Sequence, residues 1–333
     1  MPELPPEVHV VLVWERALHQ AEQILMDAVA HFSVRDVVRV AWTPERFAQN
    51  LTRFYGTALP SGSEKERECG LGPFLVIALV DEQPVYAHRR HTRGRMRVNK
   101  HLFEAKERYR SWAGGSHRVH ATLTAREGSK DVFLLLERTA QGLLTAPAWD
   151  GTVREQSVDL VGAEGWRDLD TLVTALDVTV RVVVLDDVVP PLRLLVDDLW
   201  WAVRIAEAGA DDESPDRILR IGGEPSAVHL LVPGDGSLHR RWQERLLESA
   251  VRDERGWPIP STIDRLYLAL GTVAVGGTLT MAEKRLLENT VPPRPLPTNV
   301  HEPAAAGAAV DAYIASLPTP PRRPQLLRRL ARY

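Results

Sequence analysis

Residues 112–136 read WAGGSHRVHATLTAREGSKDVFLLL, and this stretch places two histidines, His117 and His120, just after a Gly-Gly pair. The glycines, together with the β-branched Val119 and Thr122, indicate a loop that enters a short strand. Residues three apart in a strand point to opposite faces, so the two histidines do not build a shared metal site. The chain has a single cysteine, Cys69, which excludes an intrachain disulfide and a thiolate-rich metal site. We therefore predict no metal ligands among the protein side chains.

The residues that follow His120 predict the start of a helix. Thr124 and Glu127 form the S/T-x-x-E pattern of a capping box, so we expect His120 at a strand end, directly before a helix N-terminus. Backbone N–H groups at such a terminus favour nearby phosphate oxygens. Asp131 lies about two turns into that helix, where its carboxylate can bond an imidazole and fix its tautomer. The alternative is that Asp131 is an exposed polar residue of an amphipathic helix.

Upstream of this stretch, segments of strand and helix character alternate. The β-branched runs predict strands at 8–14, 34–42, 73–80 and 83–89, with the last two paired around a short turn and the basic residues after them irregular. Apolar spacing predicts helices at 16–32, 43–56 and 101–109. This order indicates an α+β domain with a small ferredoxin-like βαββαβ sheet backed by helices.

Composition sets the class of protein. The chain has 333 residues, 44% of them hydrophobic and 26% charged, which is typical of a soluble protein with room for two domains. Its formal net charge of −3 gives no electrostatic case for nucleic acid as a partner. The N-terminus has no basic region with a small-residue cleavage site, and no segment approaches about eighteen uncharged apolar residues. We therefore expect a cytoplasmic protein without a transmembrane segment.

Composition also divides the chain into three parts. We expect a first domain at 1–145, a second α/β domain at 146–292, and a Pro/Ala-rich linker with a basic amphipathic tail at 293–333. The arginines of Arg322–Arg332 flank leucines, which suits a peripheral contact with an anionic membrane surface or an acidic partner. A solvated tail is the alternative. The sequence leaves a homo-oligomer open.

The stretch SHRVHATLT resembles the active-site signature of nucleoside diphosphate kinases, a run of Arg-Asn-x-x-His-Gly-Ser-Asp-Ser before a helix with an acidic residue. His120 falls on the phosphorylated histidine, His117 on the asparagine, and Asp131 on the glutamate that orients the histidine. Ala121 and Thr122 fall on the Gly-Ser pair. The resemblance covers about residues 7–138, and it also implies the βαββαβ fold.

This resemblance implies phosphoryl transfer through a phosphohistidine, with a magnesium-bound nucleoside triphosphate as donor. It implies His120 and Asp131 as catalytic residues. The nucleotide and phosphate contacts that it implies are Arg93, Arg110, Arg16, Tyr55, His117 and Thr122. The residues themselves add one argument, because the segment 88–103 is rich in arginine and contains no acid, which favours an anion site. The sequence departs from the family at Trp14, where a phosphate-contacting lysine is expected and Arg16 is the nearest substitute.

The second domain resembles nucleotidyltransferase-fold domains around VTVRVVVLDDVVPPLRLLVDD, residues 178–198. In that fold an Asp-x-Asp pair and a third carboxylate bind two magnesium ions. Here Pro191, Arg193 and His229 occupy those positions, so the resemblance implies a degenerate module without a second active site. The expectation fails if Asp186, Asp187, Asp197 and Asp198 gather around a metal.

The sequence thus favours an enzyme, a phosphotransferase that moves the γ-phosphoryl group to a nucleotide or sugar-like acceptor. The resemblance suggests a role in the biosynthesis of a cell-surface polymer or a small molecule. The alternative is a catalytically silent nucleotide-binding or scaffold protein with two degenerate folds. A membrane-surface adaptor acting through the arginine-rich tail is a weaker third interpretation.

Overall fold

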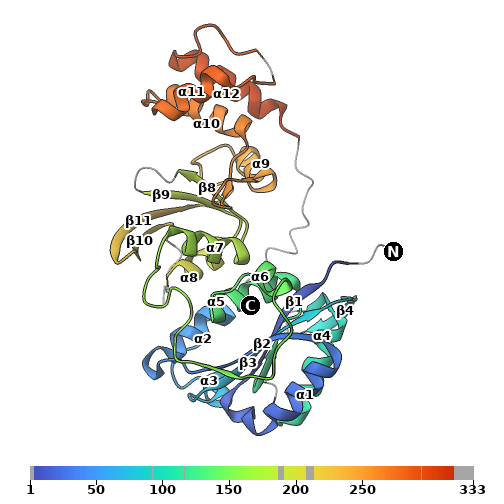
Figure 1. Ribbon diagram of the computed structural model, residues 1–333. Helices are drawn as coiled ribbons and strands as arrows, with labels where there is room; N and C mark the ends of the chain where they lie inside the picture. The colour runs from blue at the N-terminus through green and yellow to red at the C-terminus, as the bar shows by residue number, and fades with distance from the viewer. Residues whose placement is uncertain are drawn as a thin grey trace. The chain divides into compact units, whose positions relative to one another are not determined.

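The computed structural model describes residues 4–91, 94–115, 117–186, 191–207, 214–293 and 295–318. It is a mixed α+β protein with several sheets, which confirms the class expected from the sequence (Figure 1). Among the described residues, a first compact unit comprises 4–167 and 204–207, and a second comprises 168–203 and 214–318.

The first unit is built on a five-stranded sheet with the strand order β6-β1-β3-β2-β7. Strand β1 pairs antiparallel with β3 and β6, and β2 pairs antiparallel with β3 and parallel with β7. These strands are β1 (Glu7–Val13), β2 (Ser33–Val40), β3 (Phe74–Asp81), β6 (Val119–Ala121) and β7 (Arg154–Gln156). The order β1-α1-β2-β3-α4-β6 along the chain follows the alternation that the sequence predicts.

Helices cover both faces of this sheet. They are α1 (Ala21–His31), α2 (Phe47–Tyr55), α3 (Glu64–Cys69), α4 (Lys100–Ala113), α5 (Ala125–Leu136) and α6 (Ala140–Leu144), with 3-10 turns η1 (Glu15–Gln20) and η2 (Pro44–Arg46). Val11 and Val13 of β1 pack with apolar residues of α1 and α4 in one buried cluster. Because side chains alternate along a strand, the other face of β1 is free for α5, which contacts β1 closely.

The stretch 83–99 differs from the expectation. Strands β4 (Tyr86–His91) and β5 (Gly94–Asn99) pair with each other as a hairpin, whereas the sequence suggested that residues 83–89 pair with 73–80. The reason is that both edges of β3 are already occupied by β1 and β2, so no edge of β3 is left for β4. The basic stretch expected to be irregular supplies the second strand of this hairpin.

The first unit continues past residue 145. Strand β7 pairs with β2, and the backbone N–H of Trp149 donates to the carbonyl of Val34 at 2.9 Å. These bonds hold residues 146–167 against the edge of the first sheet, so these residues belong to the first unit.

The second unit has a four-stranded sheet, in the order β10-β11-β9-β8, and a set of helices. The strands are β8 (Val182–Asp186), β9 (Leu192–Val196), β10 (Asp216–Ile221) and β11 (Glu224–Leu231), with a small pair of β12 (Val251–Arg252) and β13 (Pro258–Ile259). The helices are α7 (Leu169–Thr179), α9 (Arg240–Ser249), α10 (Thr262–Ala274), α11 (Met281–Asn289) and α12 (Pro303–Ser316), together with the first part of α8 (Leu199–Ala206), whose residues 204–206 belong to the first unit.

The segment expected to be a Pro/Ala-rich linker contains helix α12. Tyr313 of this helix stacks on Tyr267 of α10, with ring centroids 3.8 Å apart and an interplanar angle of 5°. Its hydroxyl donates to Asp264 Oδ1 at 2.6 Å. Small residues such as the buried Ala306 let α12 pack closely, so composition alone misreads this part as a linker. The arginine-rich tail, Arg322–Arg332, lies outside the described residues.

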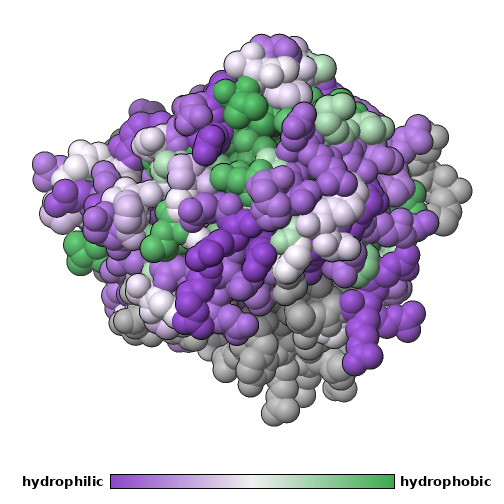
Figure 2. Space-filling model, turned by 90° about the horizontal axis from the view of Figure 1, so that it is seen from below, coloured by the Kyte–Doolittle hydropathy of each residue, from purple (hydrophilic) through white to green (hydrophobic). Residues whose placement is uncertain are grey.

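The surface shown in Figure 2 is mainly hydrophilic, with hydrophobic side chains in small groups between polar ones. Scattered apolar side chains of this kind are ordinary on a protein surface. No helix among the described residues has both the length and the apolar character that a membrane crossing needs.

Candidate functional site

His120 lies on an edge strand of the first sheet. It is in register with Leu12 of β1, and its side chain projects to the face that α5 covers. The residue is 7% exposed, so the imidazole is almost removed from water. The prediction that His120 stands at a strand end before a helix N-terminus is confirmed by β6 and α5.

The His120 ring is oriented by Asp131. Its Nε2 is 3.0 Å from Asp131 Oδ2, and the carboxylate is completely buried. An ionised carboxylate only accepts hydrogen bonds, so this contact assigns the proton to Nε2 and leaves a lone pair on Nδ1. Among the residues that the structure describes, Nδ1 has no hydrogen-bond partner. The pair therefore leaves Nδ1 of His120 unprotonated at neutral pH.

A glycine on α5 makes this contact attainable. A Cβ built on Gly128 would lie 2.0 Å from the carbonyl oxygen of Val8 and 3.2 Å from Cα of His9. Only a residue without a side chain lets α5 approach β1 so closely. Asp131 is three residues further on, almost one turn, and so it reaches the strand that carries His120.

Thr124 caps the N-terminus of α5 as the sequence predicts, but the return bond of the capping box is replaced, because Glu127 bonds Leu123 and not Thr124. Thr124 accepts a hydrogen bond from the N–H of Glu127, and Glu127 accepts one from the N–H of Leu123 at 2.7 Å. These two bonds satisfy backbone donors at the start of the helix. They fix the point where β6 turns into α5, and so they fix the position of His120 relative to Asp131.

Two aromatic residues of α2 enclose the imidazole. The rings of Phe54 and Tyr55 lie 5.3 and 5.5 Å from the His120 ring and stand nearly perpendicular to it. Lys65 of α3 lies over the Tyr55 ring, with Nζ 3.2 Å from its centroid. Tyr55, which the resemblance implies as a nucleotide contact, thus lies beside the histidine.

Two cations of α4 bind the outer edge of β6. Lys106 donates to the carbonyl of Ala121 at 2.7 Å, and Arg110 donates to the carbonyl of Val119 at 3.3 Å. These carbonyls face away from β1 and would otherwise be unpaired, because β6 is the edge of the sheet. The spacing of four residues puts both side chains on one face of α4. Arg110 also bonds Glu107, so its guanidinium is already engaged.

Lys130 connects the acid to α2. Its Nζ lies 3.0 Å from Asp131 Oδ1 and donates to the carbonyl of Phe54 at 2.8 Å. The lysine thus neutralises the buried carboxylate and ties the C-terminal end of α2 to α5.

Burial dominates the electrostatics of the site. Burial, reinforced by the nearby Lys106, lowers the pKa of His120 well below its ordinary value. Burial also raises the pKa of Asp131 to about 6, against the opposing effect of Lys130. The pKa of Lys106 falls to about 8, again because of burial. At neutral pH the imidazole is therefore uncharged and the carboxylate ionised.

His120, Glu127 and Asp131 bring three donor atoms within 4.8 Å of one another, which raises the question of a metal. The donors are already used, since His120 bonds Asp131 and Glu127 accepts from a backbone N–H. The ammonium group of Lys130 beside Asp131 repels a divalent ion. We assign no metal to this group.

The remaining predicted site residues are dispersed. Thr122 is buried on the other side of the strand end, where its hydroxyl oxygen bonds His9 Nδ1 at 3.0 Å and the N–H of Val10 at 3.0 Å. Arg16 is exposed on η1, and among the described residues it makes no contact with His120. Arg93 lies outside the described residues. His117 is half-buried, and burial with Lys65 and Arg110 lowers its pKa.

The basic stretch expected as an anion site forms one exposed face of the β4–β5 hairpin. His88 lies opposite Arg97, and Arg90 lies opposite Arg95. Residues directly opposite in an antiparallel pair share a face, so four bases gather there. Anion binding by this basic face of the hairpin stays a prediction.

Sequence reasoning missed the lysines that surround the histidine. Lys130 precedes Asp131 directly, and Lys106 precedes Arg110 by one helical turn. Because Lys106 lies four residues before Arg110, helical spacing already indicated that both side chains lie on the same face of the helix. The position of Lys65 had no such signal, because α3 reaches Tyr55 only through the tertiary fold.

In the second unit, the three positions at which the nucleotidyltransferase resemblance expects carboxylates lie just before β9, within β9 and within β11. Pro191 precedes β9, Arg193 lies within it, and His229 on β11 pairs with Asp216. Asp197 bonds Arg181 at 2.8 Å, and Asp198 accepts from the N–H of Trp201 in the first turn of α8. Among the described residues, no group of carboxylates gathers here as a metal site. Asp187 lies outside the described residues.

Comparison with known proteins gives little. No protein-family model matches the chain, and no curated protein matches it. Among solved structures, the nucleoside diphosphate kinase of Aquifex aeolicus in an orthorhombic crystal form is similar with 13% identity and a TM-score of 0.28. The match covers 41% of this chain and 99% of that chain. A TM-score this low carries no inference.

Proposed function

We propose that the first unit is a phosphotransferase that works through a phosphohistidine at His120. The observation that carries this proposal is the His120–Asp131 hydrogen bond of 3.0 Å, which fixes the Nε2–H tautomer and leaves Nδ1 as the nucleophile. The likeness of SHRVHATLT to the signature of nucleoside diphosphate kinases supports the same chemistry.

The proposed reaction has two steps. The Nδ1 lone pair attacks the γ-phosphorus of a magnesium-bound nucleoside triphosphate, an N–P bond forms, and the bond from phosphorus to the β-bridging oxygen breaks. The nucleoside diphosphate leaves with that electron pair. Since Nδ1 carries no proton, no base is needed, and Asp131 stabilises the positive charge that develops on the ring. The oxygen of an acceptor hydroxyl or phosphate then attacks this phosphorus, the N–P bond breaks with its electron pair returning to Nδ1, and a hydroxyl acceptor releases its proton to water.

Cations near the ring take up phosphate charge in this proposal. Lys65 and Lys106 are close enough to His120 to lower its pKa, and Arg110 is on the same face of α4 as Lys106. They substitute for the first-strand lysine of the family, whose position is held here by the buried Trp14. The acceptor we propose is a nucleotide or a sugar-like compound.

Because His120 is buried, the proposed reaction requires a side chain to move first. Phe54 and Tyr55 pack against a ring that is 7% exposed, so one of these side chains must move before a nucleotide reaches Nδ1.

The experiment is to incubate the full chain with magnesium and several γ-labelled nucleoside triphosphates. We expect label that is labile to acid and stable to base on the wild type, and none on His120→Ala. His19→Ala is the matched control, because His19 is exposed on η1 and outside the site. An unlabelled wild type with every nucleotide, or equal label on His120→Ala, contradicts the proposal.

The second candidate is a catalytically silent nucleotide-binding or scaffold protein. The low exposure of His120 and the engagement of Arg110 by Glu107 and Val119 favour it. In this case a fluorescent nucleotide analogue binds the full chain while no label is transferred. The labelling experiment therefore separates the two candidates.

For the second unit we propose a nucleotidyltransferase-like module that has lost its metal site. Pro191 and Arg193 stand where the resemblance expects carboxylates, and a guanidinium repels a divalent ion. Because more than one carboxylate position is lost, we expect that a variant with Arg193 alone replaced shows no magnesium-dependent nucleotidyl transfer.

A further inference from the structure

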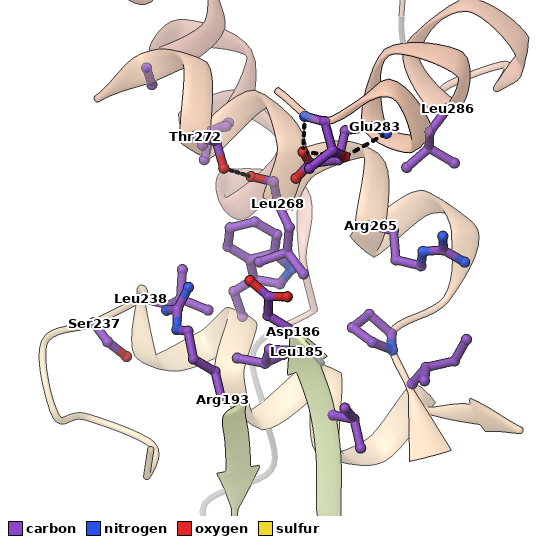
Figure 3. Close-up of a pocket in the computed structure, with 18 of the residues that line it drawn as sticks. Leu185, Asp186, Arg193, Ser237, Leu238, Arg265, Leu268, Thr272, Glu283 and Leu286 are labelled. Atoms are coloured by element: carbon purple, nitrogen blue, oxygen red, sulfur yellow. Dashed lines mark hydrogen bonds between the residues drawn. The ribbon is translucent and has the colours of Figure 1, made fainter. Parts of the chain in front are cut away.

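A cavity of about 1000 Å³ lies within the second unit, between the ends of β8 and β9 and helices α10, α11 and α12 (Figure 3). A volume of this size is at the upper end of what small-molecule sites have. Its walls mix aliphatic side chains, such as Leu185, Leu268 and Leu286, with charged ones.

One face of α10 forms a wall of this cavity. Arg265, Leu268, Thr272 and Val275 follow one another at helical spacing and all line it. Val275 is 84% exposed, so the wall leaves apolar surface in water. An apolar ligand body laid along α10 would cover that surface.

Gly271 lies on the same wall, in the interior of α10. A Cβ built there meets nothing within 4 Å, so no contact within the described chain requires a glycine. A glycine inside a helix costs stability relative to alanine. The space beside Gly271 therefore belongs to the cavity, and it allows a ligand to approach the helix backbone.

The net charge of the side chains that line the cavity determines which charge of ligand the cavity favours. Five carboxylates line the cavity against three guanidinium groups, an excess of negative charge. Asp253 pairs with Arg255, and Arg193 lies opposite Asp186 in the β8–β9 register, but the lining as a whole keeps its negative excess. In Figure 3 the Asp186 carboxylate extends from the end of β8 toward Leu268, whereas Arg265 points away from it. Glu283 caps α11 with Thr280 and keeps its negative charge at the cavity wall.

We propose that this cavity binds an organic amine, an ammonium group carried on an apolar body. Asp186 and Glu283 supply the negative field for the ammonium group, and Leu268, Leu286 and the open side of Gly271 receive the body. The site is independent of phosphoryl transfer at His120, since every lining residue belongs to the second unit.

The test uses three probes with one carbon skeleton: 4-phenylbutylamine, 4-phenylbutanol and 4-phenylbutyrate. Titration calorimetry on the full chain should show the amine binding at least about tenfold more tightly than the alcohol, and the carboxylate most weakly. Equal affinity for amine and alcohol, preference for the carboxylate, or no binding of the amine overturns the proposal.

Charge-removing variants locate the site. Asp186→Asn and Glu283→Gln should each weaken the amine several-fold and leave the alcohol unchanged, and glutamine keeps the capping hydrogen bonds of α11. Glu224→Gln is the matched control, because Glu224 is exposed on β11 and does not line the cavity. Unchanged amine affinity in both site variants contradicts the assignment.

Gly271→Leu fills the cavity from α10. We expect loss of amine binding with unchanged helical circular dichroism, and retained binding would overturn the placement along α10. His120→Ala should bind the amine like the wild type, so failure of the kinase proposal and failure of this one give different results.

Discussion

At the scale of single residues, the His120 imidazole and the Asp131 carboxylate are both removed from water, and burial moves their pKa values in opposite directions. Relative to the unfolded chain, burial favours the uncharged form of each group, the neutral imidazole of His120 and the protonated carboxyl of Asp131. The pair holds one hydrogen bond whose proton resides on Nε2 at neutral pH. This arrangement makes the stability of the first unit depend on pH in a way that can be calculated.

His120→Gln should remove part of that dependence. A lowered folded pKa means that the contribution of His120 is present above its unfolded value of 6.5 and is lost as the pH falls below it. Asp131, raised from 3.8 to about 6, acts oppositely and offsets part of this loss as the pH approaches 6. Between about pH 7 and pH 6 the wild type should therefore lose unfolding free energy, by at most about 1.4 kcal/mol per pH unit.

Urea denaturation at several pH values measures this loss. The glutamine variant should show a flatter profile in the same window, and His19→Gln should follow the wild type. Parallel profiles for wild type and His120→Gln contradict the assignment of a lowered histidine pKa.

The residues also show what sequence can predict about the site. The cap at Thr124 and the acid at Asp131 were predictable because their spacing along one helix is fixed by helix geometry. The partners of Thr122 could not be predicted, because its hydroxyl bonds His9 on the neighbouring strand β1, far away in the sequence. The contacts of Lys65 and Lys130 depend on how α2 and α3 pack, which no local pattern records.

At the scale of elements, the close contact of α5 with β1 depends on Gly128. Gly128→Ala places a Cβ against the carbonyl of Val8 and should push the helix away from the strand. We expect a loss of about 1–3 kcal/mol in unfolding free energy, the range of overpacked cores. Asp131 would also move away from His120, so the phosphorylation that we propose for His120 should fall in this variant.

Ser129→Ala is the control for this helix. Its hydroxyl bonds only the carbonyl of Ala125 within α5 among the described contacts, so the substitution should change stability by less than about 0.5 kcal/mol. Equal stability of Gly128→Ala and wild type in chemical denaturation would show that α5 tolerates the shift.

Gly271→Ala should act in the opposite direction. The new methyl group meets empty space, and alanine favours the helix, so α10 should gain about 0.8–1 kcal/mol. Gly277→Ala is the comparison, because its Cβ would lie 2.7 Å from Thr272 and should destabilise the chain. A melting temperature below wild type for Gly271→Ala contradicts an open space at this position.

Element pairing was the least predictable part of the fold. Residues 74–81 and 86–91 are both clearly strands by composition, and their partners follow from which sheet edges are free. Strand β3 is central because β1 and β2 flank it, and this pairing spans distant parts of the chain. Local turn chemistry at Asp81 therefore suggested a hairpin that the long-range pairing prevents.

At the scale of the whole molecule, the second unit has a buried polar centre of its own. Asp264 is fully buried and accepts hydrogen bonds from Tyr313 at 2.6 Å, Trp242 at 3.1 Å and Ser261 at 2.6 Å. These bonds tie α9, α10 and α12 together. The segment expected as a linker is thus held by a side chain some fifty residues earlier, which composition could not reveal.

Asp264→Ala should remove this centre. Breaking a buried charge network leaves polar groups unpaired, and we expect a loss of about 3–5 kcal/mol in unfolding free energy. Asp311→Ala on α12 is the control, because that side chain is exposed. Hydrogen exchange of α12 amides should rise sharply in Asp264→Ala and stay at the wild-type rate in the control; equal rates in both would contradict the role of Asp264.

The binding of Lys106 and Arg110 to β6 has a consequence for association between chains. An edge strand offers free carbonyls to any extended segment of another molecule, and such pairing leads to aggregation. The two cations occupy the carbonyls of Ala121 and Val119, so the strand that carries His120 is closed to intermolecular pairing. Two side chains of α4 thereby protect this strand edge from pairing with an extended segment of another chain.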